Sequence, residues 1–247
     1  MKRGEDYSEE DIRSPDGSLE AHLGARAFAD GLFVKNVASG EDKLIVKAVG
    51  SLDAFSSVTF SPDGQRLMFL AGGGTAYYPS NVMTVSTDGS DLNQLTDSTP
   101  EKWLNSDKEY ALRSAMYSPD GRQILAEIVY GALHTSAIAL LSTTDKKQTP
   151  DRLADGEPLF WSRDGTAIYF TGQDGLIHQF NLVSKQRVLI THDKGVYLLG
   201  RVPGVDAVFV RNPETGVMTV INLDGAEIDD HLKQFAMRIP LRDSKGR

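Results

Sequence analysis

The feature that most constrains the fold of this chain is a short turn sequence that occurs four times. Ser-Pro-Asp-Gly begins at Ser14, Ser61 and Ser118, and Ser-Arg-Asp-Gly begins at Ser162. These four serines are separated by 47, 57 and 44 residues. A recurrence of roughly 40 to 50 residues, with strand and turn signals inside each copy, is typical of a propeller or a solenoid. The sequence therefore predicts several copies of one small β unit.

The residues around each turn specify its local structure. The second, third and fourth copies follow short β-branched or aromatic segments that end in Phe60, Tyr117 and Trp161. Proline presets φ for a turn, and Asp-Gly supplies the positive φ that a tight hairpin needs. We therefore expect positive φ at Gly64 and Gly121. We expect six apolar side chains at equivalent repeat positions to be buried: Phe60, Tyr117, Trp161, Leu67, Ile124 and Ile168.

Five units of four short strands can be outlined in the chain. The expected strands are 11–14, 19–24, 31–37 and 43–49; 57–61, 66–71, 81–86 and 92–96; 113–118, 123–130, 136–141 and 149–153; 158–162, 167–171, 176–182 and 186–191; 195–201, 207–211, 216–222 and about 227–235. Four short strands joined by turns in about 45 residues match one propeller blade. The fifth unit lacks the Ser-Pro-Asp-Gly turn and keeps only this layout.

Length and composition fit one all-β domain. We expect residues 1–10 to be a flexible acidic N-terminus, 11–241 to be a single β-propeller domain and 242–247 to be a loose C-terminal tail. The 247 residues contain 40% apolar residues, which is enough for a substantial core. The net charge of −8 argues against nucleic-acid binding. The absence of cysteine excludes disulfides and thiolate metal sites.

The second unit carries a family pattern almost completely. The pattern runs through Phe60-Ser61-Pro62-Asp63-Gly64, Leu67-Met68-Phe69, Val85-Ser86-Thr87-Asp88-Gly89-Ser90 and Gln94-Leu95-Thr96. In this respect the chain resembles the TolB-like, WD40-like β-propeller repeat proteins. The resemblance implies an all-β propeller of about five four-stranded blades. Propellers of this family usually have six blades, so the ring either closes with five, completes a sixth from the two chain ends, or lacks one here.

The resemblance implies a non-enzymatic scaffold that binds a protein or peptide. In a four-stranded meander, the loop entering the first strand and the loop after the second lie at the same end of the blade. Long loops on a rigid scaffold often carry binding residues, and aromatic and Arg side chains are favoured anchors. The candidate binding residues at this end are Tyr77, Tyr78, Trp103, Tyr110, Arg113 and His134. We expect them to gather on one face, with Arg113 at the start of a strand.

Two other functions remain open at this stage. One is a propeller enzyme, a lyase or hydrolase acting at the mouth of the channel, for which Glu109, Arg113, His134 and Glu157 are the local acid–base candidates. The other is a sensor fragment of a larger regulator. The sequence offers no catalytic residue set, no Gly-x-Ser-x-Gly elbow and no metal-ligand spacing among its histidines, so no cofactor or metal is expected.

We expect no membrane span, because no run approaches 18 apolar residues. The chain as given starts without an export signal, and the family resemblance implies a periplasmic location if the chain is a mature form. The oligomeric state stays open.

Overall fold

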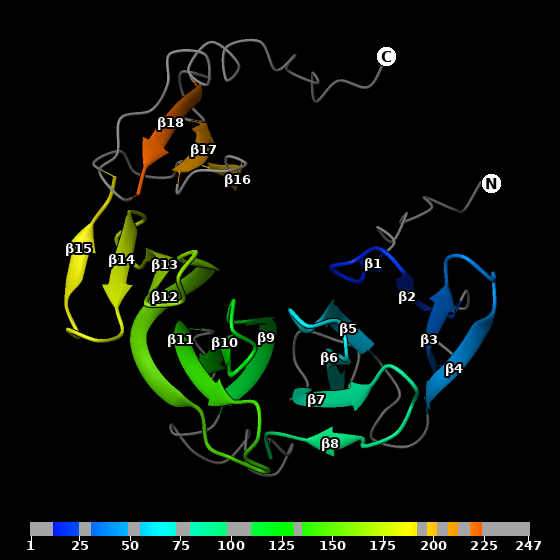
Figure 1. Cartoon of the computed structure of the whole chain (residues 1–247). Coiled ribbons are helices and arrows are strands. Elements are labelled where there is room, and N and C mark those ends of the chain that lie inside the picture. Colours follow the sequence, from blue (N-terminus) through cyan, green and yellow to red (C-terminus); the bar gives the residue numbers. More distant parts are fainter. Residues whose placement is uncertain are drawn as a thin grey trace, which may run out of the picture. The chain divides into compact units, whose positions relative to one another are not determined.

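The structure is a computed structural model that describes residues 12–24, 31–48, 55–72, 80–97, 110–130, 135–191, 197–201, 207–211 and 218–223. In these ranges all regular secondary structure is β-strand (Figure 1). The residue contacts divide the chain into two compact units, Met1–Pro158 and Leu159–Arg247. Within the described ranges, no helix is long and apolar enough to cross a membrane.

The first unit contains three successive antiparallel meanders. The first is β1 (Ile12–Arg13), β2 (Leu19–Leu23), β3 (Gly31–Asn36) and β4 (Asp42–Lys47). The second is β5 (Phe55–Phe60), β6 (Arg66–Gly72), β7 (Ser80–Ser86) and β8 (Asn93–Gln94). The third is β9 (Tyr110–Tyr117), β10 (Gln123–Tyr130), β11 (Thr135–Ser142) and the first part of β12 (Asp151–Trp161). Each strand pairs with the next along the chain, as a propeller blade requires.

The second unit continues the same pattern. The last part of β12 is followed by β13 (Ala167–Gly172), β14 (Ile177–Asn181) and β15 (Arg187–Leu189). A three-stranded sheet comes next, made of β16 (Tyr197–Arg201), β17 (Ala207–Arg211) and β18 (Met218–Asn222). The pairs β13–β14, β14–β15, β16–β17 and β17–β18 are antiparallel. The fold is therefore all-β, built from several antiparallel sheets in chain order.

Within the described ranges the expected strands recur, with two corrections in the third and fourth repeats; the strand expected at about 227–235 lies outside the described residues. Separate strands were expected at 149–153 and 158–162, but β12 is one strand of 11 residues. Gly156, at φ 141°, allows the bend between its two halves that a larger residue would resist. The strand expected at 113–118 begins earlier, at Tyr110. Tyr110 and Arg113 therefore both lie within β9, rather than in a loop and at a strand start.

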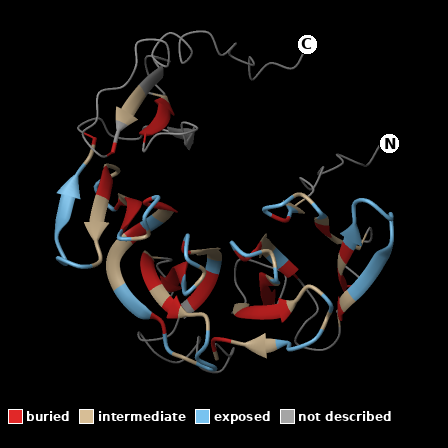
Figure 2. Cartoon of the chain, in the orientation of Figure 1, coloured by how far each residue is buried: buried red, intermediate tan, exposed pale blue. Residues whose placement is uncertain are grey.

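Buried side chains concentrate on the middle strands of each meander (Figure 2). One core cluster joins the first and second meanders and includes Phe60 and Leu67. Another joins the second and third and includes Ile124. Five of the six side chains expected to be buried are so, at 7% exposure or less; they are Phe60, Leu67, Ile124, Trp161 and Ile168. The sixth, Tyr117, is half-buried and packs against the second cluster.

The four repeated turns have one hydrogen-bonded structure. In the third copy, the Ser118 hydroxyl donates to Asp120 Oδ1 at 2.6 Å and accepts from the Gln123 backbone N–H at 2.9 Å. Asp120 Oδ1 also accepts from the Arg122 backbone N–H at 3.0 Å. The same three bonds recur at the turns that begin at Ser14, Ser61 and Ser162. The serine, nearly inaccessible in every copy, is therefore as important to the turn as Asp-Gly.

The glycine of each turn has the backbone conformation expected from the sequence. Gly64 and Gly121 have φ of 71° and 72°, which confirms the prediction. A Cβ added at Gly121 would lie 3.4 Å from Pro62 Cδ, and one at Gly64 would lie 3.6 Å from Pro15 Cδ. Successive turns of the first three repeats therefore lie side by side, each proline next to the following glycine.

Candidate functional site

Most of the expected binding face falls outside the part of the chain that the structure describes. Tyr77, Tyr78, Trp103 and His134 lie outside the described residues. Tyr110 is the first residue of β9, where its backbone pairs with Tyr130, but its side chain is not among those described. Arg113 is the candidate whose side chain the structure describes, and the candidate site is centred on this residue.

A β-bulge in β9 presents Arg113. Ser114 pairs with Glu127 of β10 and Leu112 pairs with Ile128, so Arg113 is an extra residue without a partner across the ladder. In a regular strand, neighbouring side chains point to opposite faces. The bulge breaks this alternation, and both Arg113 and Ser114 reach the same carboxylate, that of Glu127. Bulges that redirect a side chain in this way often stand beside functional sites.

Glu127 is the buried half of this pair. Its residue is 6% exposed, in the apolar strand β10. The carboxylate accepts hydrogen bonds from Arg113 Nη1 at 3.1 Å and Ser136 Oγ at 2.8 Å, both on Oε1. Ser114 Oγ donates to the other oxygen, Oε2, at 3.4 Å. A buried carboxylate needs such donors, because its desolvation would otherwise cost several kcal/mol.

Arg113 itself is not buried with its partner. The Arg113 side chain is 47% exposed, whereas the Glu127 side chain is 8% exposed. Its hydrogen bond to Glu127 is the one bond that the structure gives its guanidinium among the described residues. Arginine has five N–H donors in a planar fork. A fixed and half-exposed guanidinium therefore keeps most of its donors for a second acceptor.

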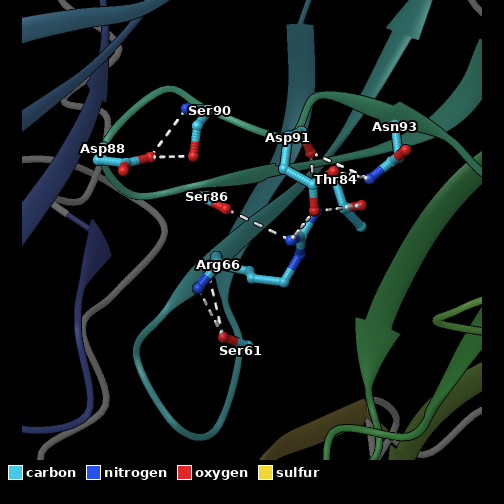
Figure 3. Close-up of polar contacts among 8 residues, drawn as sticks. All are labelled: Ser61, Arg66, Thr84, Ser86, Asp88, Ser90, Asp91 and Asn93. Atoms are coloured by element: carbon cyan, nitrogen blue, oxygen red, sulfur yellow. Dashed lines mark hydrogen bonds and ion pairs between the residues drawn. The ribbon is translucent and has the colours of Figure 1, made fainter.

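Arg66, in the second meander, shows the opposite arrangement (Figure 3). Its Nη1 donates to Asp91 Oδ2 at 2.7 Å and to Ser86 Oγ at 3.4 Å. Its Nη2 donates to the Asp91 carbonyl at 2.9 Å and to Thr84 Oγ1 at 3.2 Å. These bonds connect β6 to β7 and to the segment before β8. Arg66 is a structural clamp whose donors are used inside the blade.

A histidine–carboxylate contact lies in the second unit. His178, 6% exposed, is 2.9 Å from Asp174 Oδ2 through its Nε2 and stacks on Phe170. The hydrogen bond from His178, with a smaller contribution from the Leu176 backbone N–H, lowers the pKa of Asp174. Arg187 lies over the Phe170 ring, 5.1 Å from its centroid. This cluster connects β13, the turn after it, β14 and β15, which is a structural role.

The geometry does not assemble a proton-transfer pair from the candidates that are described. Arg113 and Glu157 are the two acid–base candidates within the described ranges, and no hydrogen bond joins them. Glu157 is exposed in β12. Among the described residues no group of three His, Asp or Glu side chains could hold a metal ion. What the placed residues can do is bind an anionic group at Arg113.

The residues around Arg113 were missed by the sequence reasoning. Glu127, Ser114 and Ser136 carry no motif, and a single glutamate in a strand usually faces solvent. One signal could have found Glu127. It is the one charged residue in the run Ile124 to Val129, whose apolar members on both sides predict a fully buried strand.

Known structures share this fold. An oligogalacturonate lyase solved in complex with manganese is 11% identical, with a TM-score of 0.62, over 85% of this chain and 62% of that chain. TolB from Acinetobacter baumannii is 13% identical, with a TM-score of 0.50, over 88% of this chain and 55% of that chain. A prolyl endopeptidase is 13% identical, with a TM-score of 0.55, over 85% of this chain and 36% of that chain.

These comparisons define the chain as having a TolB-like β-propeller fold. The chain spans less than two thirds of the length of the lyase and TolB chains that it matches. No family model matches the sequence, and no curated protein matches it. At such low identity the likeness concerns the fold, and propellers host binding proteins and enzymes alike.

Proposed function

We propose that the chain is a non-enzymatic, protein- or peptide-binding β-propeller scaffold of the TolB-like type. In this proposal residues 11–241 form one propeller domain of about five four-stranded blades. Support comes from the succession of antiparallel meanders and from the propeller fold of the similar structures. Closure of the ring by terminal strands would protect the open sheet edges, as ring closure does in other propellers.

The observation that carries the binding role is the state of Arg113. An arginine that only stabilised its sheet would donate its N–H groups to hydrogen bonds within that sheet, as Arg66 does. Among the described residues, Arg113 is instead held by one bond, to a buried carboxylate, and its side chain is half-exposed. An arginine fixed in this way loses little conformational entropy when it binds. Such preorganised arginines are frequent anchors of interfaces.

The binding face that we propose extends from Arg113 to the loops around the second and third blades. Its members are Tyr77, Tyr78, Trp103, Tyr110, Arg113 and His134. Tyr and Trp side chains offer a large contact area and have few rotatable bonds. The meander topology supports this grouping, because the loop before β9 and the loop after β10 leave the blade at the same end.

A comparison of three baits tests the proposal. The baits are the intact chain, a Tyr77→Ala/Tyr78→Ala/Trp103→Ala variant and a control, Val183→Ala/Val188→Ala/Leu189→Ala. The control removes three side chains that are 80%, 49% and 40% exposed, far along the sequence from the proposed face. We expect a protein from the source cells to bind the intact chain and the control and to be lost from the first variant. Retention of the same proteins by all three baits would contradict the proposal.

A further inference from the structure

The repeat itself shows that Glu127 is an exception. It lies nine residues after the turn serine Ser118, and the same position holds Leu23 in the first repeat, Leu70 in the second and Thr171 in the fourth, so Glu127 is the charged member of the set. Leu70 is 1% exposed and belongs to the core between the second and third meanders. A buried carboxylate at a position that a leucine can fill is not needed for packing. A local departure of this kind, at a cost in stability, is expected at functional sites.

The three hydroxyl and guanidinium donors around Glu127 explain how the exception is tolerated. Ser136 comes from β11, Ser114 from β9, and Arg113 from the bulge between Leu112 and Ser114. The two serines satisfy both carboxylate oxygens from inside the sheet. The third donor, Arg113, has a side chain that is half-exposed to solvent. Glu127 therefore fixes where the guanidinium stands without covering it.

We propose that Arg113 binds a carboxylate of the partner, and that Glu127 is the residue that positions Arg113 for it. This inference rests on the proposed function and names the chemical group that the site recognises. A guanidinium matches a carboxylate with two parallel N–H···O bonds, which an ammonium cannot do. Because Glu127 uses Nη1, the remaining N–H groups of the fork can form this pair. The carboxylate belongs either to a peptide C-terminus or to an acidic side chain.

Small carboxylates are the probes that test this assignment. N-acetylalanine stands for a C-terminus, N-acetylaspartate amide stands for an acidic side chain, and N-acetylalaninamide is the uncharged control. The readout is the Nε–Hε nuclear magnetic resonance signal of Arg113, identified as the one lost in an Arg113→Lys variant. We expect saturable shifts with millimolar affinity for at least one carboxylate, and none for the amide. The stronger of the two carboxylates identifies the source of the group.

Two substitutions separate positioning from packing. Glu127→Leu installs the residue of the second repeat. It should leave the melting temperature unchanged or raised, because it removes a buried carboxylate and the Arg113 guanidinium that remains is half-exposed to water. We expect it to weaken carboxylate binding about 2- to 10-fold, because Arg113 must then be ordered on binding. Glu127→Gln keeps an oxygen acceptor for Arg113, and it should bind at least as tightly as the native chain.

Three results would overturn the inference: no saturable shift with either carboxylate, equal shifts with the amide, or native affinity in Glu127→Leu. A second readout is the melting temperature, which carboxylates should raise in the native chain and leave unchanged in Arg113→Lys. The proposed function fails separately, in the bait comparison. If carboxylates bind but no protein is captured, only the proposed function fails. If a protein is captured but no carboxylate binds, only the assignment of Arg113 to a carboxylate fails.

Discussion

Ser118→Ala should reveal what the repeated turn contributes to stability. The Ser118 hydroxyl is the centre of the turn, because it donates to Asp120 and accepts from the Gln123 N–H. The residue is 2% exposed, so water cannot take the place of the lost oxygen. Each hydrogen bond of this kind contributes about 1 kcal/mol. The exposure of Asp120 limits the gain from its charge, and the variant should lose about 2 kcal/mol of unfolding free energy.

The effect should depend on pH in a defined direction. The Ser118 hydroxyl, followed by the Arg122 backbone N–H, lowers the pKa of Asp120 in the folded chain. A carboxyl with a lowered folded pKa stabilises above its unfolded pKa of about 3.9 and loses that contribution as the pH falls through the folded value. The difference between native chain and variant should therefore be full at neutral pH and smaller near pH 2–3.

Urea unfolding followed by circular dichroism measures both effects. The control is Arg122→Ala, which removes a side chain that is 86% exposed and 3.9 Å from the Asp120 carboxylate. That variant should change the unfolding free energy by less than about 0.5 kcal/mol. A Ser118→Ala variant as stable as the control, or one whose loss grows as the pH falls, would refute the hydrogen-bonding account of the turn.

Three further results are expected. Tyr117→Phe should leave the unfolding free energy unchanged or raise it by about 1 kcal/mol. The buried Tyr117 hydroxyl has no hydrogen-bond partner among the described residues, and burial raises its pKa to about 12. A loss above about 1 kcal/mol in urea unfolding would contradict this. Gly121→Ala should cost about 1 kcal/mol or more in the same assay, because φ is 72° there; an unchanged midpoint would be evidence against strain. In an acid titration, the unfolding free energy of the native chain should fall below about pH 4. The reason is that the turn serines lower the pKa values of Asp16, Asp63, Asp120 and Asp164 in the folded chain. An unfolding free energy that stays constant down to about pH 2 would contradict this coupling.

The sequence was sufficient to predict those features of the fold that local chemistry determines. Asp-Gly after proline predicted the positive φ of Gly64 and Gly121, because few other residues adopt it cheaply. The aromatic and β-branched residues that flank the turns predicted the strands and most of the buried set. The role of the turn serines escaped notice, because their bonds to the residue five positions later form only once the hairpin has closed.

The site was less accessible to sequence reasoning because its parts meet only across strands. Glu127, Ser136 and Arg113 are brought together by pairing registers, and the bulge that presents Arg113 has no glycine to mark it. The expected start of the strand at Arg113 was wrong for the same reason, since Tyr110 to Leu112 continue the pairing with β10. Cross-strand registers depend on the assembled sheet and not on neighbouring residues.

One paired measurement tests most directly whether Arg113 anchors a partner. The double variant Arg113→Ala/Glu127→Leu removes the guanidinium and its buried partner together, so that no unpaired charge remains inside the sheet. The single variant Arg66→Ala removes the clamp that joins β6 to β7 and the segment before β8. With capture of the partner and urea unfolding measured for both, the double variant should keep its stability and lose the partner, whereas Arg66→Ala should lose about 1–3 kcal/mol and keep it. Capture of the partner by the double variant at the native level would contradict the account.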